Sequence, residues 1–291
     1  MVEEAYLYIG LSNLDLGSRS LVLSRGILVE STFAHLMSPM MLAFAKPLNG
    51  GPHPGPWKAT SGGSSHDITA QISIPLTGDN DRVEALRLGA TIVSLMRLRC
   101  DPAITMVAFS SLPFDSLKNL PDTTAPVVPL EVYPRFIPLM NAGGEKASQT
   151  IGWVKSHFET AIELRSKHQE FRVASAALDA AQFIQNDALA LISLWGALEA
   201  LFSPSTSELK FRVSALIAAY LHKPGIARLE AQRNIAKLYD KRSSAAHGKP
   251  RHVQDDLVAS FILLRSCIMK MILEREVPTK EKLERLLFGD E

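Results

Sequence analysis

Cysteine is almost absent from this chain, which has two, Cys100 and Cys267, among 291 residues. Two cysteines so far apart supply neither a disulfide framework nor the close spacing of a zinc site. They also give no sign of an oxidising compartment. The sequence therefore excludes a small disulfide-stabilised fold, and it predicts no metal centre and no cofactor.

Long apolar runs are missing as well. The most apolar stretch, residues 188–198, is eleven residues without a charge, whereas a membrane-spanning helix needs about 20 apolar residues. The first residues, Met-Val-Glu-Glu, are acidic and lack the basic and apolar segments of a secretory signal. These observations predict a cytoplasmic protein with no membrane partner.

The chain also lacks an excess of charge of one sign, because 31 Lys and Arg balance 30 Asp and Glu and leave a net charge of +1. Hydrophobic residues make up 46% and charged residues 21% of the chain, which is ordinary globular composition with ample material for a core. At this length we expect one large domain or two of ordinary size.

The first half of the chain mixes strand and helix patterns. Residues 68–76 alternate strictly between apolar and mostly polar side chains, which is typical of a strand with one buried face. Six prolines in residues 111–138 limit that stretch to an edge strand or an extended loop. We expect an α+β domain over residues 1–145, whose role the sequence leaves open. Its predicted elements are strands at 5–11, 20–33, 68–76 and 104–109 and helices at 34–45 and 82–99.

Glycine and proline interrupt this domain between residues 46 and 66, where there are five glycines and four prolines. Such a segment predicts a mobile loop. The run Gly62-Gly63-Ser-Ser-His66 resembles a phosphate cradle, but no Gly-Lys-Ser/Thr follows and the next element is a strand, so we disfavour phosphate binding there. The boundary to the next domain is expected within residues 141–144.

The second half of the chain is helical in pattern, which predicts an all-α domain over residues 146–291. The apolar face of the stretch 253–275 is wider than one bundle normally buries, and this favours a dimer interface. The predicted helices cover 151–175, 176–202 (one helix or a pair), 226–247, 253–275 and 279–288, with a further helix opened by a capping box of Ser205 and Glu208.

One motif in this half contains candidate catalytic residues. The stretch Tyr239-Asp-Lys-Arg-Ser-Ser-Ala-Ala-His-Gly248 closes the helical pattern of residues 226–247, and Arg242 lies on the apolar stripe of that helix. An unpaired charge on a core-facing stripe is costly, so we expect Arg242 to meet an anion or to lie in a shared cleft. His247 ends the helix, and Gly248 is the residue type expected just past the last turn. A guanidinium and a histidine five residues apart suggest phosphate chemistry.

Basic residues are concentrated around this motif. Between Arg228 and Arg251, seven Lys or Arg stand against two acids, although the whole chain is nearly neutral. A basic patch on a neutral protein is the usual footprint of a phosphate-bearing partner, with a solvated helix face as the alternative. The predicted nucleic-acid-binding residues are Arg233, Lys237, Lys241, Lys249 and Arg251.

Glu199 is the only charged residue between positions 188 and 202, and it lies on a stripe of large apolar side chains. A buried carboxylate needs a cation or several hydrogen-bond donors, and Arg212 and Arg242 are the candidate partners. We favour an internal salt bridge that fixes the register of two helices. A role for Glu199 in aiming Arg242 at a substrate stays open.

The motif resembles the HEPN superfamily, in particular its Apea-like branch. The likeness lies in Tyr239-Asp-Lys-Arg-Ser-x3-His-Gly248 together with the upstream stretches Leu194-Trp-Gly-Ala-Leu-Glu-Ala-Leu-Phe202 and Leu209-Lys-Phe-Arg-Val213, and it covers about residues 170–275. HEPN domains are helical bundles that pair, and many are metal-independent endoribonucleases. The resemblance thus implies that the predicted α+β domain is followed by an all-α HEPN-type helical bundle, which forms a homodimer.

The resemblance also implies roles for individual residues. Arg242 would stabilise the charge that develops on an RNA phosphate, and His247 would move the proton during attack of the 2′-hydroxyl. RNA would be the partner, the setting a toxin or phage-defence system, and a neutralising antitoxin or regulator a further partner. The supporting residues on the matching stretches would be Glu199, Arg212, Tyr239, Asp240 and Ser243.

One position departs from the family pattern. Catalytic members often have Asn, Asp or His directly after the arginine, and this chain has Ser243. The alternative is therefore a non-catalytic HEPN module that binds RNA or a nucleotide or serves as a scaffold. A third reading takes the motif only as a helix end with an Arg242–Glu199 bridge.

Two other chemistries fail on geometry. A Ser/His/Asp triad would need contact between Asp240 and His247, whose backbones are about 10 Å apart on a helix. A metal pair of His247 and His252 would have to form across the intervening Gly-Lys-Pro turn, so we disfavour it as well. The Arg242 and His247 side chains are themselves turned about 140° apart around a helix. A two-fold dimer resolves this difficulty, because each site can then use residues of both chains.

Overall fold

The computed structural model describes residues 5–76, 81–121, 124–137, 146–202, 209–249 and 251–289. The chain divides into two compact units, each described by itself below. The sheet unit comprises Met1–Gly89, Ile104–Tyr133 and Lys146–Gln149, and the helical unit comprises Ala90–Ala103, Pro134–Glu145 and Thr150–Glu291. An antiparallel sheet region thus precedes a helical C-terminal region. The expected boundary at 141–144 lies outside the described residues.

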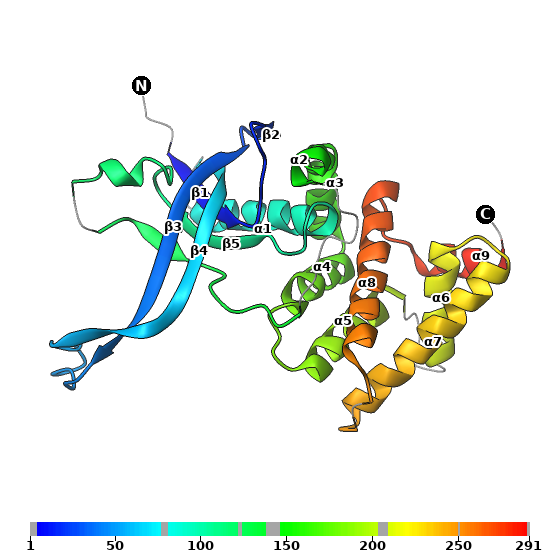
Figure 1. The fold of residues 1–291 in the computed structure, drawn as a ribbon. Helices are drawn as coiled ribbons and strands as arrows, with labels where there is room; N and C mark the ends of the chain where they lie inside the picture. The colour runs from blue at the N-terminus through cyan, green and yellow to red at the C-terminus, as the bar shows by residue number, and fades with distance from the viewer. Residues whose placement is uncertain are drawn as a thin grey trace. The chain divides into compact units, whose positions relative to one another are not determined.

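The sheet unit is built on a six-stranded sheet in the order β2-β3-β4-β1-β5-β6, with every neighbouring pair antiparallel (Figure 1). The strands at 68–76 and 104–109 are confirmed within β4 and β5. The strands are β1 Tyr6–Ser12, β2 Leu21–Val22, β3 Leu28–Ala43, β4 Trp57–Pro75, β5 Thr105–Ser110 and β6 Val127–Pro129.

One face of the sheet packs against helix α1 (Asp81–Arg99), which confirms the predicted helix at 82–99. Ile9 and Ile74 are fully buried on this face. Gly89 brings the helix close to the strands, because a Cβ atom at this position would lie 2.2 Å from Ile9 Cδ1. A larger residue would have to displace a close-packed side chain.

Beyond the rest of the sheet, β3 and β4 continue as a two-stranded ribbon, in which residues 34–43 pair with residues 57–68 (Figure 1). The predicted helix at 34–45 is therefore wrong, because pairing with β4 overrides an apolar composition that lacks helical periodicity. The predicted loop at 46–66 is too long, since residues 57–66 belong to β4. The ribbon and its connection expose the large apolar side chains of Phe33, Met37, Met40, Met41, Leu42, Phe44, Leu48 and Trp57.

The helical unit follows the periodicity of the sequence closely in its last three helices, α7, α8 and α9. The predicted helix at 151–175 is instead two, because His168 adopts an extended conformation (φ −123°, ψ 109°) between α3 and α4. The capping box of Ser205 and Glu208 lies outside the described residues. Its helices are α3 Gly152–Lys167, α4 Gln169–Ala181, α5 Asp187–Phe202, α6 Leu209–Leu221, α7 Ile226–Ala246, α8 Gln254–Glu274 and α9 Lys280–Phe288. The short helix α2, Ala147–Thr150, belongs almost entirely to the sheet unit.

Helix α5 is the centre of this unit and contacts α4, α6, α7 and α8. Trp195 is fully buried on it, and its indole N–H donates to Ser260 Oγ of α8 at 3.0 Å. Tyr239 of α7 meets the Trp195 ring edge-on, with ring centroids 5.3 Å apart. Among the helices of the described part of the chain, none combines the length and apolarity that crossing a bilayer requires.

Candidate functional site

The end of helix α7 has the local structure that the sequence predicts. His247 follows the last helical residue with φ −92° and ψ 17°, and Gly248 adopts the left-handed conformation at φ +71°. Gly248 N then donates to Ala245 O at 3.1 Å, and Lys249 N donates to Ser244 O at 3.0 Å. Glycine at position 248 therefore closes the helix without the strain that a side chain would add.

Arg242 points from α7 to helix α5, where its Nη2 donates to Glu199 Oε2 at 2.9 Å. The two side chains are partly buried, with 23% and 20% of their surfaces exposed. The expected ion pair is thus present, and Arg242 is the partner. The pair is singly bonded, because Arg242 Nε and Glu199 Oε1 are buried without a hydrogen-bond partner among the described residues. Desolvation of the two charges is therefore incompletely offset.

Arg212 of α6, the other candidate, forms no ion pair with Glu199 in the part of the chain that the structure describes. Its Nε atom is buried, and it too has no hydrogen-bond partner among the described groups.

Tyr239 packs against Arg242 on the same helix. The residue is 7% exposed, and the guanidinium carbon of Arg242 lies 5.6 Å from the centre of the Tyr239 ring. Burial raises the pKa of the Tyr239 hydroxyl above its ordinary value, and the negative charge of Glu199 raises it further. The hydroxyl therefore stays protonated, and the ring acts as a neutral platform between Trp195 and Arg242.

His247 is exposed at the end of the helix, in contrast to Arg242. The different environments of the two residues agree with their separation of about 140° around the helix axis. Ser243 lies between them in sequence, and its carbonyl accepts from His247 N at 3.1 Å.

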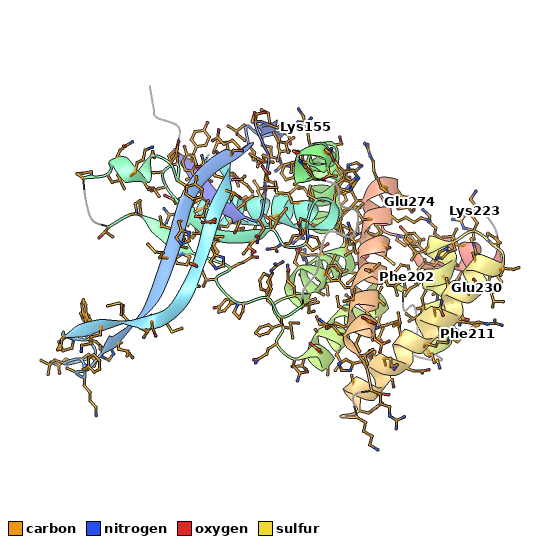
Figure 2. All side chains as sticks on the ribbon, viewed as in Figure 1. Lys155, Phe202, Phe211, Lys223, Glu230 and Glu274 are labelled. Carbon is orange, nitrogen blue, oxygen red and sulfur yellow. The ribbon has the colours of Figure 1, made fainter. Side chains whose placement is uncertain are left out.

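Asp240 turns towards α6, where its Oδ2 atom lies 2.7 Å from Lys210 Nζ. This ion pair borders a hollow of about 560 Å³ between α6 and α7, lined by Lys210, Phe211 and Gln232 among others. Phe211 is 60% exposed there (Figure 2). By helical spacing, His247 follows Asp240 along nearly the same line of α7, seven residues further on. The hollow is therefore on the His247 side of the helix.

The five predicted nucleic-acid-binding residues do not all lie on the Arg242 face of α7. Lys241 pairs with Asp256 at 3.5 Å and donates to Arg251 O at 3.0 Å. Arg233 lies nine residues before Arg242, which places it about 180° away around the helix. Of the five, the four exposed cations that pair with no acidic residue among the described ones are Arg233, Lys237, Lys249 and Arg251.

Other features of the site were not signalled by the sequence. The Lys210–Asp240 pair and the Trp195–Ser260 hydrogen bond join residues from different helices, and no local pattern marks such contacts. In the described ranges, no group of three or more His, Cys, Asp or Glu side chains is placed to hold a metal ion. No protein-family model, curated protein or solved structure matches this chain.

Proposed function

We propose that this protein is a metal-independent endoribonuclease of the HEPN type that acts as a homodimer. The observation that carries the proposal is the pairing of a fixed guanidinium with an exposed imidazole on one helix end: Glu199 orients Arg242, and His247 faces solvent. The sequence resemblance to the HEPN superfamily supports the same assignment. A toxin or phage-defence setting, with a neutralising antitoxin or regulator, belongs to the proposal on that resemblance alone.

The proposed reaction is an intramolecular transesterification. The RNA 2′-oxygen attacks the adjacent phosphorus, the bond from phosphorus to the 5′-oxygen breaks, and the products carry a 2′,3′-cyclic phosphate and a 5′-hydroxyl. His247 moves the proton that the 2′-hydroxyl loses and the 5′-oxygen gains. Arg242 stabilises the negative charge that grows on the non-bridging oxygens. Its partner Glu199 limits the motion of the guanidinium before substrate arrives.

Pairing of two chains is part of the proposal, because Arg242 and His247 of one chain project in different directions. A two-fold axis brings Arg242 of one chain to His247 of its partner, and the symmetric site forms at the same time. Helix α8 offers an apolar surface for such pairing, since Ile262 is 48% exposed and Val258 and Leu263 are only partly buried.

The test is cleavage of a labelled RNA in excess EDTA, with the ends identified chemically. We expect fragments with 2′,3′-cyclic phosphate from the wild type and a loss of about 100-fold or more for His247→Ala, the usual scale for a proton-transfer group. His222→Ala is the matched control, because His222 is also an exposed histidine at the end of a helix of this unit. Absence of cleavage by the wild type, or equal cleavage by His247→Ala, would contradict the proposal.

A second candidate is a HEPN-like module that binds RNA without cleaving it. Two observations favour it: Glu199 neutralises Arg242, and the exposed cations Arg233 and Lys237 are on the far side of the helix. The double substitution Arg233→Gln/Lys237→Gln then weakens RNA binding and lowers its salt dependence by about two ionic contacts, while Arg242→Gln leaves affinity unchanged. Intact RNA recovered from the complex would select this candidate.

A further inference from the structure

The hollow between α6 and α7 is on the His247 side of α7, and no step of the proposed reaction uses it. Its volume of about 560 Å³ is in the range of small-molecule sites. We call it the α6–α7 hollow. It is lined by Leu209, Lys210 and Phe211 of α6 and by Gln232 and Ala236 of α7.

Phe211 presents an accessible aromatic ring to this hollow. Helix α6 buries every residue from Val213 to Tyr220, whereas Phe211 in its first turn is 60% exposed (Figure 2). Across the hollow, Gln232 Nε2 donates to Ser214 Oγ at 3.0 Å, and this bond holds the amide of Gln232 in place. The hollow therefore combines an open aromatic face with a fixed polar wall, and a flat ring that enters it can stack on Phe211.

Accessible cations lie on the outer side of the same hollow. Arg233 and Lys237 are exposed, and by helical spacing they lie about 60° and 100° around α7 from Ala236, which lines the hollow. Glu230, one of the two acids of α7, is also exposed and offsets one of these charges. The remaining excess is positive, which favours an anionic partner.

The hollow and His247 share one line of α7. His247 follows Ala236 by eleven residues, which is about 20° around the helix and about 16 Å along its axis. Asp240 lies between them on this line, but Lys210 neutralises its charge at 2.7 Å. A single RNA strand bound at His247 can therefore continue along α7 to the hollow. The base that reaches the hollow then belongs to a nucleotide near the cleaved linkage and not to the linkage itself.

We propose that the α6–α7 hollow is a base-binding subsite for single-stranded RNA, in which a nucleobase stacks on Phe211 while Arg233 and Lys237 contact neighbouring phosphates. The inference rests on the proposed function, which supplies RNA as the substrate and His247 as the cleavage position. An aromatic ring beside a row of cations is the usual platform for an unpaired strand. Duplex RNA fits this platform poorly, because its bases are already stacked on one another.

Fluorescence anisotropy with a labelled single-stranded RNA tests the proposal. The parent protein is His247→Ala, so that the strand stays intact. Adding Phe211→Ala should weaken binding by at least about fivefold, the lower end for loss of one base–aromatic stack, whereas Phe211→Trp should retain it. A strand of the same length without bases should bind the parent protein and the Phe211→Ala protein equally. Absence of RNA binding by the parent, unchanged binding by Phe211→Ala, or the same loss for the strand without bases overturns the proposal.

Phe288→Ala is the matched control, because Phe288 of α9 is an exposed phenylalanine of the same unit and does not line the hollow. It should leave RNA affinity unchanged. Phe211 is itself largely exposed, so the thermal unfolding midpoint of Phe211→Ala should stay close to that of the parent protein.

The subsite and the proposed nuclease fail separately. If the wild type cleaves no RNA but binding still depends on Phe211, the nuclease is refuted and the subsite belongs to a module that only binds RNA. If the wild type cleaves RNA and Phe211→Ala does not weaken binding, the subsite is refuted and the nuclease stands.

Discussion

The two units of this protein differ in how well sequence motifs locate their buried polar residues. In the helical unit, the arginine that the sequence singles out is already bonded to Glu199 and packed over Tyr239. In the sheet unit, Glu30 and Ser73 belong to no motif, yet Gln71 bonds to Glu30, and Ser73 Oγ is buried without a hydrogen-bond partner among the described residues. A sequence motif thus finds a residue with the right chemistry, but only packing shows whether its charge is still available. The predictions below test this contrast, from the largest expected effect to the smallest.

Removal of the central indole should have the largest effect. Trp195→Ala deletes a fully buried ring and leaves Ser260 Oγ without its indole donor, so we expect a loss of about 3–5 kcal/mol in the free energy of unfolding. Urea unfolding followed by circular dichroism measures it. Trp57→Ala in the exposed ribbon is the control and should change stability by less than about 0.5 kcal/mol. Similar losses for the two variants would contradict a core centred on α5.

Breaking the ion pair should have the next largest effect. Arg242→Ala leaves Glu199 partly buried without a cation, and we expect a loss of about 1–3 kcal/mol, below the range for fully buried pairs because both side chains retain some exposure. A double-mutant cycle with Glu199→Ala isolates the coupling. The exposed Arg233→Ala serves as control. A coupling energy near zero would show that the Arg242–Glu199 ion pair between α7 and α5 does not stabilise the fold.

In the sheet unit, close packing between α1 and β1 should be sensitive to one methyl group. Gly89→Ala places a Cβ atom 2.2 Å from Ile9 Cδ1, and we expect a loss of about 1–2 kcal/mol after the intrinsic helix gain of alanine is included. Ile9→Val removes that Cδ1 atom, so the double variant should recover most of the loss relative to Ile9→Val alone. Gly196→Ala in open space on α5 should instead stabilise by up to about 1 kcal/mol. Destabilisation by both alanines would argue against a local clash.

The smallest expected effect is a dependence on alkaline pH. The pKa of Tyr239 is raised in the folded state above its ordinary value of 10.0, so the folded state holds this proton more tightly than the unfolded state. Its contribution to stability is therefore complete below pH 10.0 and is lost as the pH rises through the folded-state pKa. Between pH 9 and pH 11, the thermal unfolding midpoint of Tyr239→Phe should fall less steeply than that of the wild type. Parallel profiles for the variant and the wild type would refute this assignment.

Local signals account for the parts of the fold that could be predicted. Helices α7, α8 and α9 were predicted to within about two residues, because apolar periodicity and terminal residues such as Gly248 act within one element. The alternating residues 68–76 predicted their strand for the same reason. The salt bridge of Glu199 followed from a single charge on an apolar stripe. Which arginine pairs with Glu199, Arg242 or Arg212, could not be predicted, because the choice depends on how three helices pack together.

Features that depend on distant partners could not be predicted. The backbone of residues 57–66, rich in Gly and Ser, is extended because β3 supplies its hydrogen bonds, and β3 in turn overrides the apolar pattern of residues 34–43. The break at His168 has no glycine or proline to announce it. Glu30 and Ser73 are neighbours only because β3 and β4 lie side by side, so no local pattern marks them.

The proposal that Arg242 of one chain and His247 of its partner act on the same phosphate is tested most directly by mixing two inactive variants. Arg242→Gln and His247→Ala proteins are unfolded together, refolded, and assayed on labelled RNA in EDTA. Half of the dimers formed should contain one chain of each kind, with one intact site of two, so we expect recovery of about a quarter of the wild-type activity. A mixture no more active than either variant alone would contradict the account.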